Sequence, residues 1–233
     1  MCTVSIIPFG DAGFRLIGNR DERRSRPIAS SPAIHRSGRH DAIFPTDPLG
    51  GGTWIGVNTA GLAIATLNRY DEPAREQPGS LLSRGSLATR ALGYERLEDV
   101  IRFATSLSPR QFAPFRLVAA QRRGVALVSS DGRAVDVERR RLSIPLMFTS
   151  SSLGDARVLA VRQELFQQLV GRRPERWLAG QSRFHNHRWP DYPELSVIMD
   201  RPEAATMSRS TIDVDATGVC FRYEAFGTVA EAA

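Results

Sequence analysis

Residues 14–22 read Phe14-Arg15-Leu16-Ile17-Gly18-Asn19-Arg20-Asp21-Glu22, a strand-like run that continues into four consecutive polar residues. Residues 2–9 are also rich in strand-forming side chains and end at a turn, so the two segments predict an antiparallel hairpin. In an extended chain Asn19 and Asp21 share one side, and the other two polar residues share the opposite side. The hairpin therefore ends in a polar tetrad with two chemically distinct faces.

The flanking sequence extends this β-rich start. Residues 23–50 are rich in Pro, Ser, Arg and Gly and predict a long irregular surface segment, which is more often functional than accidental. The stretch Gly50-Gly51-Gly52-Thr53-Trp54 then leads into a second predicted hairpin, formed by residues 53–58 and 62–68. The glycines are typical of a turn, and they could also cradle a ligand.

The remainder alternates helices and strands. Helical spacing predicts helices over 80–93, 95–107 and 154–170, the last one ending at Gly171. Residues 172–194 predict a loop with room for one short helix. Further strands are expected over 115–121, 124–130, 134–138, 147–149, 195–200, 206–214 and 218–225. This order predicts a single α+β domain over residues 1–233, with helices packed outside β-sheet layers.

All 31 basic residues are Arg, and the chain contains no Lys. Schiff-base chemistry, Walker-type phosphate loops and Ser-Lys hydrolysis are therefore excluded, because each needs a Lys. The N-terminus is the one ordinary amine that remains. The net charge of +6 is modest, and acidic residues are interleaved with most of the Arg groups, so we expect no nucleic-acid partner.

Two cysteines, Cys2 and Cys220, indicate a reducing compartment and no disulfide framework. The apolar runs are too short to span a membrane, and the N-terminus does not resemble a signal peptide. We therefore expect a soluble cytoplasmic protein. Cys220 lies between Val219 and Phe221 in a predicted strand and is expected to be buried and inert.

Cys2 becomes the N-terminal residue if Met1 is removed. It then carries a thiol and a free α-amine whose reference pKa, about 7.7–8.0, suits a base for its own nucleophile. The alternative is a small strand residue near a terminus. Asp21 could anchor an ammonium group, or it could belong to a solvated strand end. Asn68 ends an apolar strand, where its amide could face an oxyanion or simply form a turn.

The segment Phe184-His185-Asn186-His187-Arg188-Trp189 places two His on one side of an extended chain. No third ligand with metal-site spacing accompanies them, so we predict no metal site. A loop that contacts a ligand, or an ordinary surface loop, fits the segment better.

Four motifs together resemble one known family. They are Met1-Cys2, Asn19-Arg20-Asp21-Glu22, Gly51-Gly52-Thr53-Trp54-Ile55-Gly56, and Gly61-Leu62 leading to Asn68. By their order and spacing the chain is identified as a member of the NRDE family, also called the transport and Golgi organisation protein 2 family. That family is similar to the N-terminal nucleophile (Ntn) hydrolases with an N-terminal Cys. The resemblance implies a four-layer αββα sandwich.

The resemblance also implies site residues. Cys2 falls on the nucleophile, Asp21 on the residue that orients the N-terminal amine, and Asn68 on an oxyanion-hole residue. Arg20 and Arg209 fall near the catalytic arginines. We expect substrate contacts from Asn19, Thr53, Trp54, Ser151 and His187. Two departures stand out. Arg20 follows Asn19, whereas the hydrolases carry Arg before Asn, and the stretch Thr149-Ser150-Ser151-Ser152 stands where relatives often have an Asn.

Two functions remain open. The first is an Ntn-type hydrolase that cleaves a non-peptide amide or an acyl (thio)ester of a small molecule through Cys2, with no cofactor. The second is a non-catalytic protein that uses the same cleft to bind or carry haem, a lipid or acyl-CoA. The roles proposed within the family include lipid metabolism, haem trafficking and Golgi organisation. The sequence specifies neither the substrate nor the oligomeric state.

Overall fold

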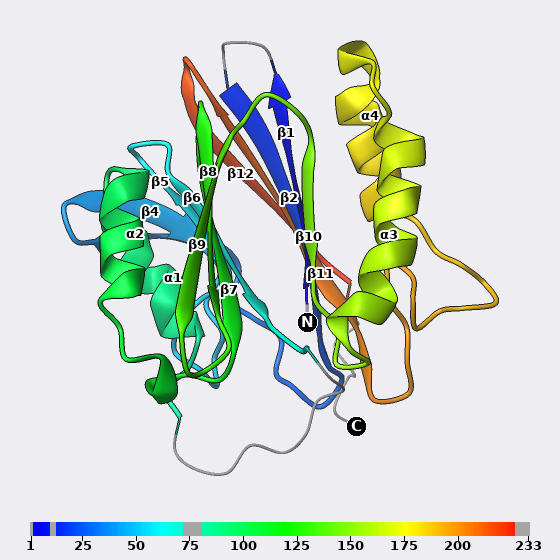
Figure 1. Ribbon diagram of the computed structural model, residues 1–233, viewed down its shortest axis with the longest axis horizontal. Helices are drawn as coiled ribbons and strands as arrows, with labels where there is room; N and C mark the ends of the chain where they lie inside the picture. The colour runs from blue at the N-terminus through cyan, green and yellow to red at the C-terminus, as the bar shows by residue number, and fades with distance from the viewer. Residues whose placement is uncertain (1, 10–12, 72–80, 227–233) are drawn as a thin grey trace.

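Two β-sheets face each other, and helices cover both outer faces (Figure 1). The computed structural model describes residues 2–9, 13–71 and 81–226. All pairings between neighbouring strands in the two sheets are antiparallel. Antiparallel sheets with alternating side chains can bury one face against a second sheet and the other against helices.

The first sheet has five strands in the order β10-β1-β2-β11-β12. Its strands are β1 (Cys2–Phe9), β2 (Gly13–Arg23), β10 (Leu146–Thr149), β11 (Ala204–Asp215) and β12 (Gly218–Ala225). The predicted hairpin is formed by β1 and β2, and Cys2 pairs with Arg20 in it. The polar tetrad thus ends β2 directly beside the start of β1.

The second sheet has seven strands in sequential order from β3 to β9. They are β3 (Ala33–Ser37), β4 (His40–Phe44), β5 (Ile55–Asn58), β6 (Ala63–Asn68), β7 (Phe115–Gln121), β8 (Gly124–Ser130) and β9 (Val135–Arg141). The second predicted hairpin is formed by β5 and β6. The sequence prediction matches β7 and β8 residue for residue.

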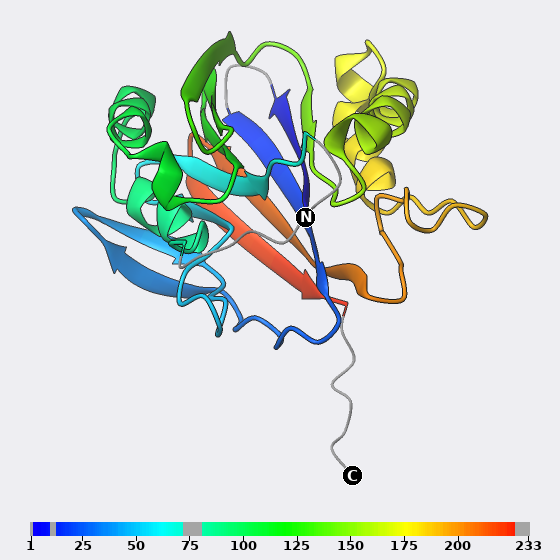
Figure 2. The same cartoon turned by 60° about the horizontal axis from the view of Figure 1, so that its bottom comes forward.

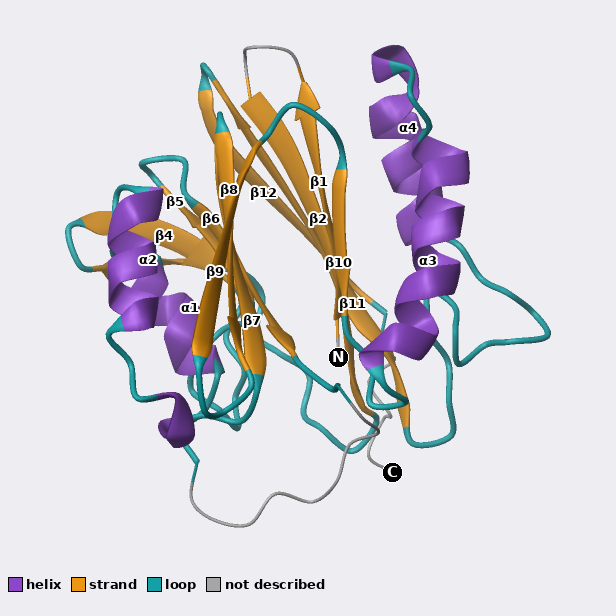
Figure 3. Ribbon diagram, in the orientation of Figure 1, coloured by secondary structure: helices purple, strands orange, loops and turns teal. Residues whose placement is uncertain are grey.

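The helices divide between the two outer faces (Figures 2 and 3). Helices α1 (Gly85–Ala91) and α2 (Leu97–Thr105) pack on the seven-stranded sheet, and a 3-10 turn (Pro109–Gln111) follows. Helices α3 (Asp155–Val170) and α4 (Pro174–His185) pack on the five-stranded sheet. The α+β class and the αββα layering are therefore confirmed.

Helix α3 confirms the clearest helix prediction. It differs from the predicted range by one residue at its start, and Gly171, at φ +64°, follows its last residue. A positive φ is readily adopted by glycine and ends helical hydrogen bonding. No helix in the described residues is long and apolar enough to cross a membrane.

The prediction of a long irregular segment over residues 23–50 is wrong over residues 33–44. These residues form the β3–β4 hairpin, which turns at Gly38 with φ +60°. Strand β3 is an edge strand, and three of its five residues are exposed. Its composition therefore resembles that of a loop, and the cross-strand pairing with β4 is what defines it.

The predictions for residues 172–200 need two corrections. Residues 174–185 form the twelve-residue helix α4, whose inward face carries polar Gln181 and His185 beside Phe184 and so lacks a simple apolar stripe. Residues 195–200 are not a strand and contribute one isolated bridge, at Asp200. The Val197 carbonyl accepts its hydrogen bond from the Asn19 side chain and not from a neighbouring strand.

Cys220 is exposed, which corrects the expectation of a buried thiol. It lies on β12, the edge strand of its sheet. Its neighbours Val219 and Phe221 pack against the core between the sheets. Side chains alternate along a strand, so Cys220 points away from that core.

Candidate active site

Cys2 lies at the first residue of β1, at one end of the sandwich. It is only 7% exposed and belongs to the core between the sheets, together with Val4 and Ile6. A cavity of about 440 Å³ opens beside it. The first sheet contributes Cys2 and Arg20 to the cavity wall, and the second contributes Thr66 and Asn68 from β6. Cys2 is therefore held on a rigid strand at the edge of a packed core.

Ser150 holds the main chain of Cys2 from the neighbouring β10 end. The Cys2 N–H donates to Ser150 Oγ at 3.2 Å, and the Ser150 N–H donates to the Cys2 carbonyl at 2.9 Å. Ser150 is fully buried. The atom that would become the α-amine after Met1 removal therefore already has a hydroxyl partner.

The electrostatics of this site disfavour negative charge. Burial raises the pKa of the Cys2 thiol above its usual value. Burial likewise raises the pKa of Asp21, although the positive charge of Arg162 and a hydrogen bond from Thr206 oppose that rise. A thiolate would form here only with a base close by and positive charge around it.

Asp21 lies on β2 and is only 2% exposed. The Thr206 hydroxyl donates to Asp21 Oδ1 at 2.6 Å, and the Met199 N–H donates to that same hydroxyl at 2.8 Å. Strand β11 therefore fixes the orientation of the Asp21 carboxyl through Thr206. The carboxyl also belongs to the wall of the Cys2 cavity.

Arg162, a wholly buried cation on α3, supports the same region. Its guanidinium donates to Thr3 Oγ1 at 2.6 Å, to Thr149 Oγ1 at 2.9 Å and to the Ser196 carbonyl at 2.5 Å. Burial lowers its pKa to about 10, so it stays charged at neutral pH. This charge lies close enough to Asp21 to favour the carboxylate form.

Arg201 is a second buried cation on the same side. It donates to the hydroxyls of Ser151 and Ser152, at 3.0 and 3.1 Å. Its positive charge also lowers the pKa of Asp21. The three consecutive serines therefore have two different partners. Ser150 contacts Cys2, and Ser151 and Ser152 contact Arg201.

On the opposite wall, polar side chains stand at alternate positions along β6 and just beyond its end. The Asn68 amide donates to the Tyr70 hydroxyl at 2.7 Å. Thr66 is buried, and its hydroxyl has no hydrogen-bond partner among the described residues. An amide and a hydroxyl that share one strand face at the cavity are suited to donate to a substrate oxygen.

Arg20 lines the Cys2 cavity from strand β2 of the first sheet. It forms an ion pair with Asp47 at 2.7 Å, and its guanidinium lies 4.3 Å from the centre of the Trp54 ring. Asp47 also pairs with Arg26 at 2.8 Å and accepts hydrogen bonds from the main chain of the glycine-rich turn, including the Gly50 N–H. Arg20 therefore connects the polar tetrad to the glycine-rich motif.

A family model described as Transport and Golgi organisation 2 matches residues 1–228. The chain belongs to this family. A comparison with curated proteins finds no match.

Solved structures of Ntn hydrolases share the fold of this family member. Penicillin V acylase from Agrobacterium tumefaciens is 13% identical at a TM-score of 0.51, covering 97% of this chain and 86% of its own. A variant of conjugated bile acid hydrolase from Clostridium perfringens is 10% identical at 0.52, covering 96% and 92%. The Caenorhabditis elegans ortholog of N-acylethanolamine-hydrolyzing acid amidase is 12% identical at 0.53, covering 91% and 92%. Identities this low establish the fold alone.

Six residues singled out from the family motifs meet at one cavity. Cys2, Asp21, Asn68, Arg20, Thr53 and Trp54 all line it. Four others do not. Asn19 faces α4 and donates to the main-chain carbonyls of His185 and Val197, each at 3.0 Å. Ser151 is buried against Arg201.

His187 and Arg209 also lie outside the cavity. His187 contacts the Trp189 ring, with 4.5 Å between the ring centres. Arg209 donates to Asn186 and pairs with Glu224. No described histidine lines the Cys2 cavity, so haem binding there has Cys2 as its one soft ligand among the described residues.

Sequence reasoning noted Ser150 as part of the serine run and missed four other residues that the fold brings to this region. They are Arg162, Arg201, Tyr70 and Arg84. The sequence does contain one sign of Arg162, because this residue interrupts the apolar face of α3. A charged side chain buried at that position needs hydrogen-bond partners. The others carry no local signal, because they reach the site from separate loops.

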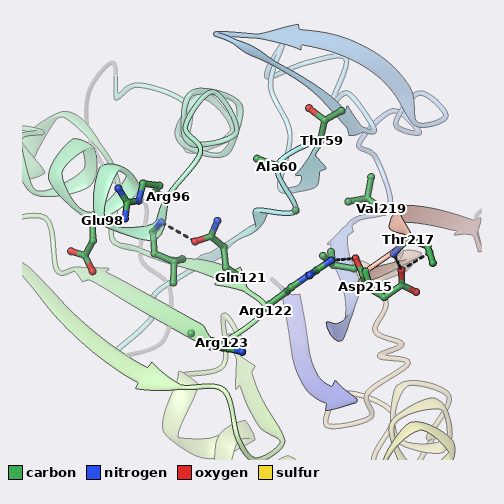
Figure 4. A pocket seen from close by; sticks show the side chains of 16 residues that line it. Thr59, Ala60, Arg96, Glu98, Gln121, Arg122, Arg123, Asp215, Thr217 and Val219 are labelled. Atoms are coloured by element: carbon green, nitrogen blue, oxygen red, sulfur yellow. Dashed lines mark hydrogen bonds between the residues drawn. The ribbon is translucent and has the colours of Figure 1, made fainter. Parts of the chain in front are cut away.

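A larger cavity, of about 850 Å³, lies at the opposite end of the sandwich (Figure 4). The turn before β6 contributes to it, whereas Asn68 at the far end of β6 lines the Cys2 cavity. Arg122 reaches across it to the Asp215 carbonyl. None of the described residues lining it is a Cys, Ser or His, so it lacks the nucleophile that the Cys2 cavity has.

Proposed function

We propose that this chain is an Ntn-type hydrolase that cleaves an amide or an acyl (thio)ester bond in a small molecule. Cys2 is the nucleophile, and Met1 must be removed first. The observation that carries this proposal is the position of Cys2. It begins a central strand of an αββα sandwich and shares one cavity with Asp21 and Asn68.

The first half of the reaction needs a base for the thiol. Burial raises the pKa of the Cys2 thiol, so the thiolate must form as it attacks. The α-amine freed by Met1 removal accepts the thiol proton, and the sulfur bonds to the substrate carbonyl carbon. Ser150 Oγ, 3.2 Å from that nitrogen, orients the amine.

The attack places negative charge on the carbonyl oxygen. The Asn68 amide is the donor for this oxyanion, because it faces the cavity from the opposite sheet. Its present acceptor, the Tyr70 hydroxyl, would yield to the substrate oxygen. The tetrahedral adduct then collapses, the bond to the leaving group breaks, and the ammonium returns its proton to the leaving group.

Water completes the cycle. The amine takes a proton from water as the water oxygen attacks the acyl-sulfur carbonyl, and the second collapse releases the acid and restores the thiol. Asp21 stabilises the α-ammonium that forms in both halves. The cations Arg162 and Arg201 favour the ionised form of Asp21 against its burial.

Intact-protein mass spectrometry tests this proposal. Protein produced in its native host should lack Met1, and incubation with acyl thioesters and acyl amides should add one acyl group to Cys2. Cys2→Ala protein should hydrolyse none of them. Retained Met1 in the native host, or equal hydrolysis by Cys2→Ala protein, would refute the mechanism. A haem titration without a spectral shift would count against the carrier alternative.

A further inference from the structure

Arg84 is a cation in the Cys2 cavity without an acidic partner among the described residues. It directly precedes α1, and its side chain lines the cavity. It donates to the Pro114 carbonyl at 3.1 Å, and it also contacts the Tyr70 hydroxyl. Both partners are neutral.

Three other cations line this cavity, and two of them are paired; the third, Arg23, is exposed and has no ion pair among the described residues. Arg20 and Arg26 both pair with Asp47, at 2.7 and 2.8 Å. Glu22 lies 3.5 Å from Arg20 and 3.6 Å from Arg26. Asp47 and Glu22 are therefore already engaged in ion pairs. Among the described residues Arg84 is the half-buried cation of the cavity wall without an ion pair, and the more distant charge of Glu22 also acts on it.

Its surroundings make this charge energetically unfavourable. Burial lowers the pKa of the Arg84 guanidinium, because water solvates it poorly. The side chain is also close enough to the Cys2 thiol for their charges to interact. An anion bound to Arg84 would restore the lost solvation in a site where water screens charges weakly.

Two further groups in the same cavity wall have unused hydrogen-bonding capacity. The Thr66 hydroxyl and the Trp54 indole N–H are buried, and neither has a partner among the described residues. Buried polar groups usually have partners, so these unmatched groups indicate a polar ligand. They are independent of Arg84, since Trp54 directly precedes β5 and Thr66 lies on β6.

We propose that Arg84 makes this cavity selective for amide or thioester substrates that carry an anionic group, a carboxylate or a phosphate. The inference rests on the proposed hydrolase function and adds the substrate class. The anionic group lies on the acyl part or on the leaving group, within reach of Cys2. Arg84 determines specificity and takes no proton in the reaction.

Binding to Cys2→Ala protein tests the inference without turnover. Three thioesters form matched pairs: octanoyl-pantetheine is neutral, octanoyl-phosphopantetheine adds a phosphate to the leaving group, and suberoyl-pantetheine adds a carboxylate to the acyl chain. Titration calorimetry should show that at least one anionic probe binds roughly 10- to 100-fold more tightly than the neutral one, the range of a charge-assisted contact. The arm that shows the gain identifies the source of the charge.

Three further variants on the Cys2→Ala background complete the test. Arg84→Gln should abolish the anionic preference and keep the Kd of the neutral probe within about twofold, which also reports an intact fold. Arg84→Lys should retain part of the preference, because it keeps the charge and loses the planar fork. Arg157→Gln removes one positive charge from an exposed site on α3, away from the cavity, and should leave the preference unchanged.

The outcomes separate the two proposals. Equal binding of all three probes, or a preference that survives in Arg84→Gln, overturns the role of Arg84. Turnover of octanoyl-pantetheine by protein that begins at Cys2 tests the hydrolase separately. Hydrolysis without anionic preference would support the hydrolase function and reject the role of Arg84. Anionic preference without hydrolysis would support the role of Arg84 in binding and reject the hydrolase function.

Discussion

The two faces of the β1–β2 hairpin use their polar residues in opposite ways. On the face toward α3 and α4, Ser5 bonds His185 at 2.7 Å, and His185 bonds Asn19 at 3.0 Å. This network is fully buried and lies outside the Cys2 cavity. On the face toward the second sheet, Cys2 and Arg20 end an apolar run at that cavity.

This difference shows that a reactive-looking arrangement needs access as well as geometry. The Ser5–His185–Asn19 chain has the contacts of a catalytic triad, but no substrate can reach it at 0% exposure of Ser5 and His185. Burial lowers the pKa of His185 to about 3, far from the range of a base at neutral pH. The buried Ser5–His185–Asn19 network therefore stabilises the fold. Asp21, on the same side of β2 as Asn19, lies at the Cys2 cavity together with Cys2 and Arg20 of the inter-sheet face.

The largest expected effect is kinetic and belongs to the inter-sheet face. Cys2→Ala should reduce hydrolysis by about three orders of magnitude or more, because the covalent route is lost. It should change the free energy of unfolding by only about 1 kcal/mol or less, since one small buried group is removed. Steady-state kinetics and urea unfolding measure the two quantities. A loss of stability that matches the loss of rate would contradict the division between the faces.

The largest stability effect belongs to the helix side. Arg162→Met should lower the free energy of unfolding by about 3–5 kcal/mol, because Thr3, Thr149 and the Ser196 carbonyl lose a buried charged donor. The exposed control Arg157→Met on the same helix should change it by less than about 0.5 kcal/mol. Urea denaturation curves compare them, and similar values for both variants would show that the Arg162 network contributes nothing.

His185 predicts a pH dependence of stability. Its pKa is about 3 in the folded protein, against an ordinary value of 6.5, so the unfolded chain binds the proton more readily. The stability that neutral His185 supplies is complete above pH 6.5 and is lost as the pH falls toward 3. His185→Gln should flatten this part of the curve by up to about 1.4 kcal/mol per pH unit. Identical pH dependence in both proteins, measured by urea unfolding, would contradict the prediction.

The smallest effect concerns Ser150, which lies at the boundary between the faces. Ser150→Ala should lower kcat by roughly 5- to 30-fold, because the α-amine loses the hydroxyl that orients it. The pKa of the base in the pH profile of kcat/KM should shift, which a purely structural role would not cause. Ser150→Thr should restore most of the rate. An unchanged pH profile in the Ala variant would leave Ser150 without a positioning role.

The sequence predicted most of the helices and strands because their periodic patterns are local. Helix α3 and strands β7 and β8 fall where the spacing of apolar residues places them. Strand β3 and helix α4 were not predicted because contacts outside their own segments stabilise them. The β3 ladder needs β4, and the buried polar face of α4 needs Ser5 and Asn19.

The sequence by itself determined the chemical inventory of this protein. With no Lys in the chain, the N-terminus is the one ordinary amine, and the family motifs put Cys2 beside it. Side-chain alternation along an extended strand also suffices to separate Asn19 and Asp21 from Arg20.

Which polar residues share a cavity depends on the three-dimensional packing of the chain. Asn19 and Asp21 lie on one side of β2, but the first is sealed beneath α4 whereas the second reaches the open end beside Cys2. Arg84 reaches the cavity wall from a separate segment, and Ser150, Arg162 and Arg201 reach the surrounding region through the packing of the two sheets and their helices. Burial and charge compensation depend on all of these neighbours at once, and no local pattern in the chain encodes them.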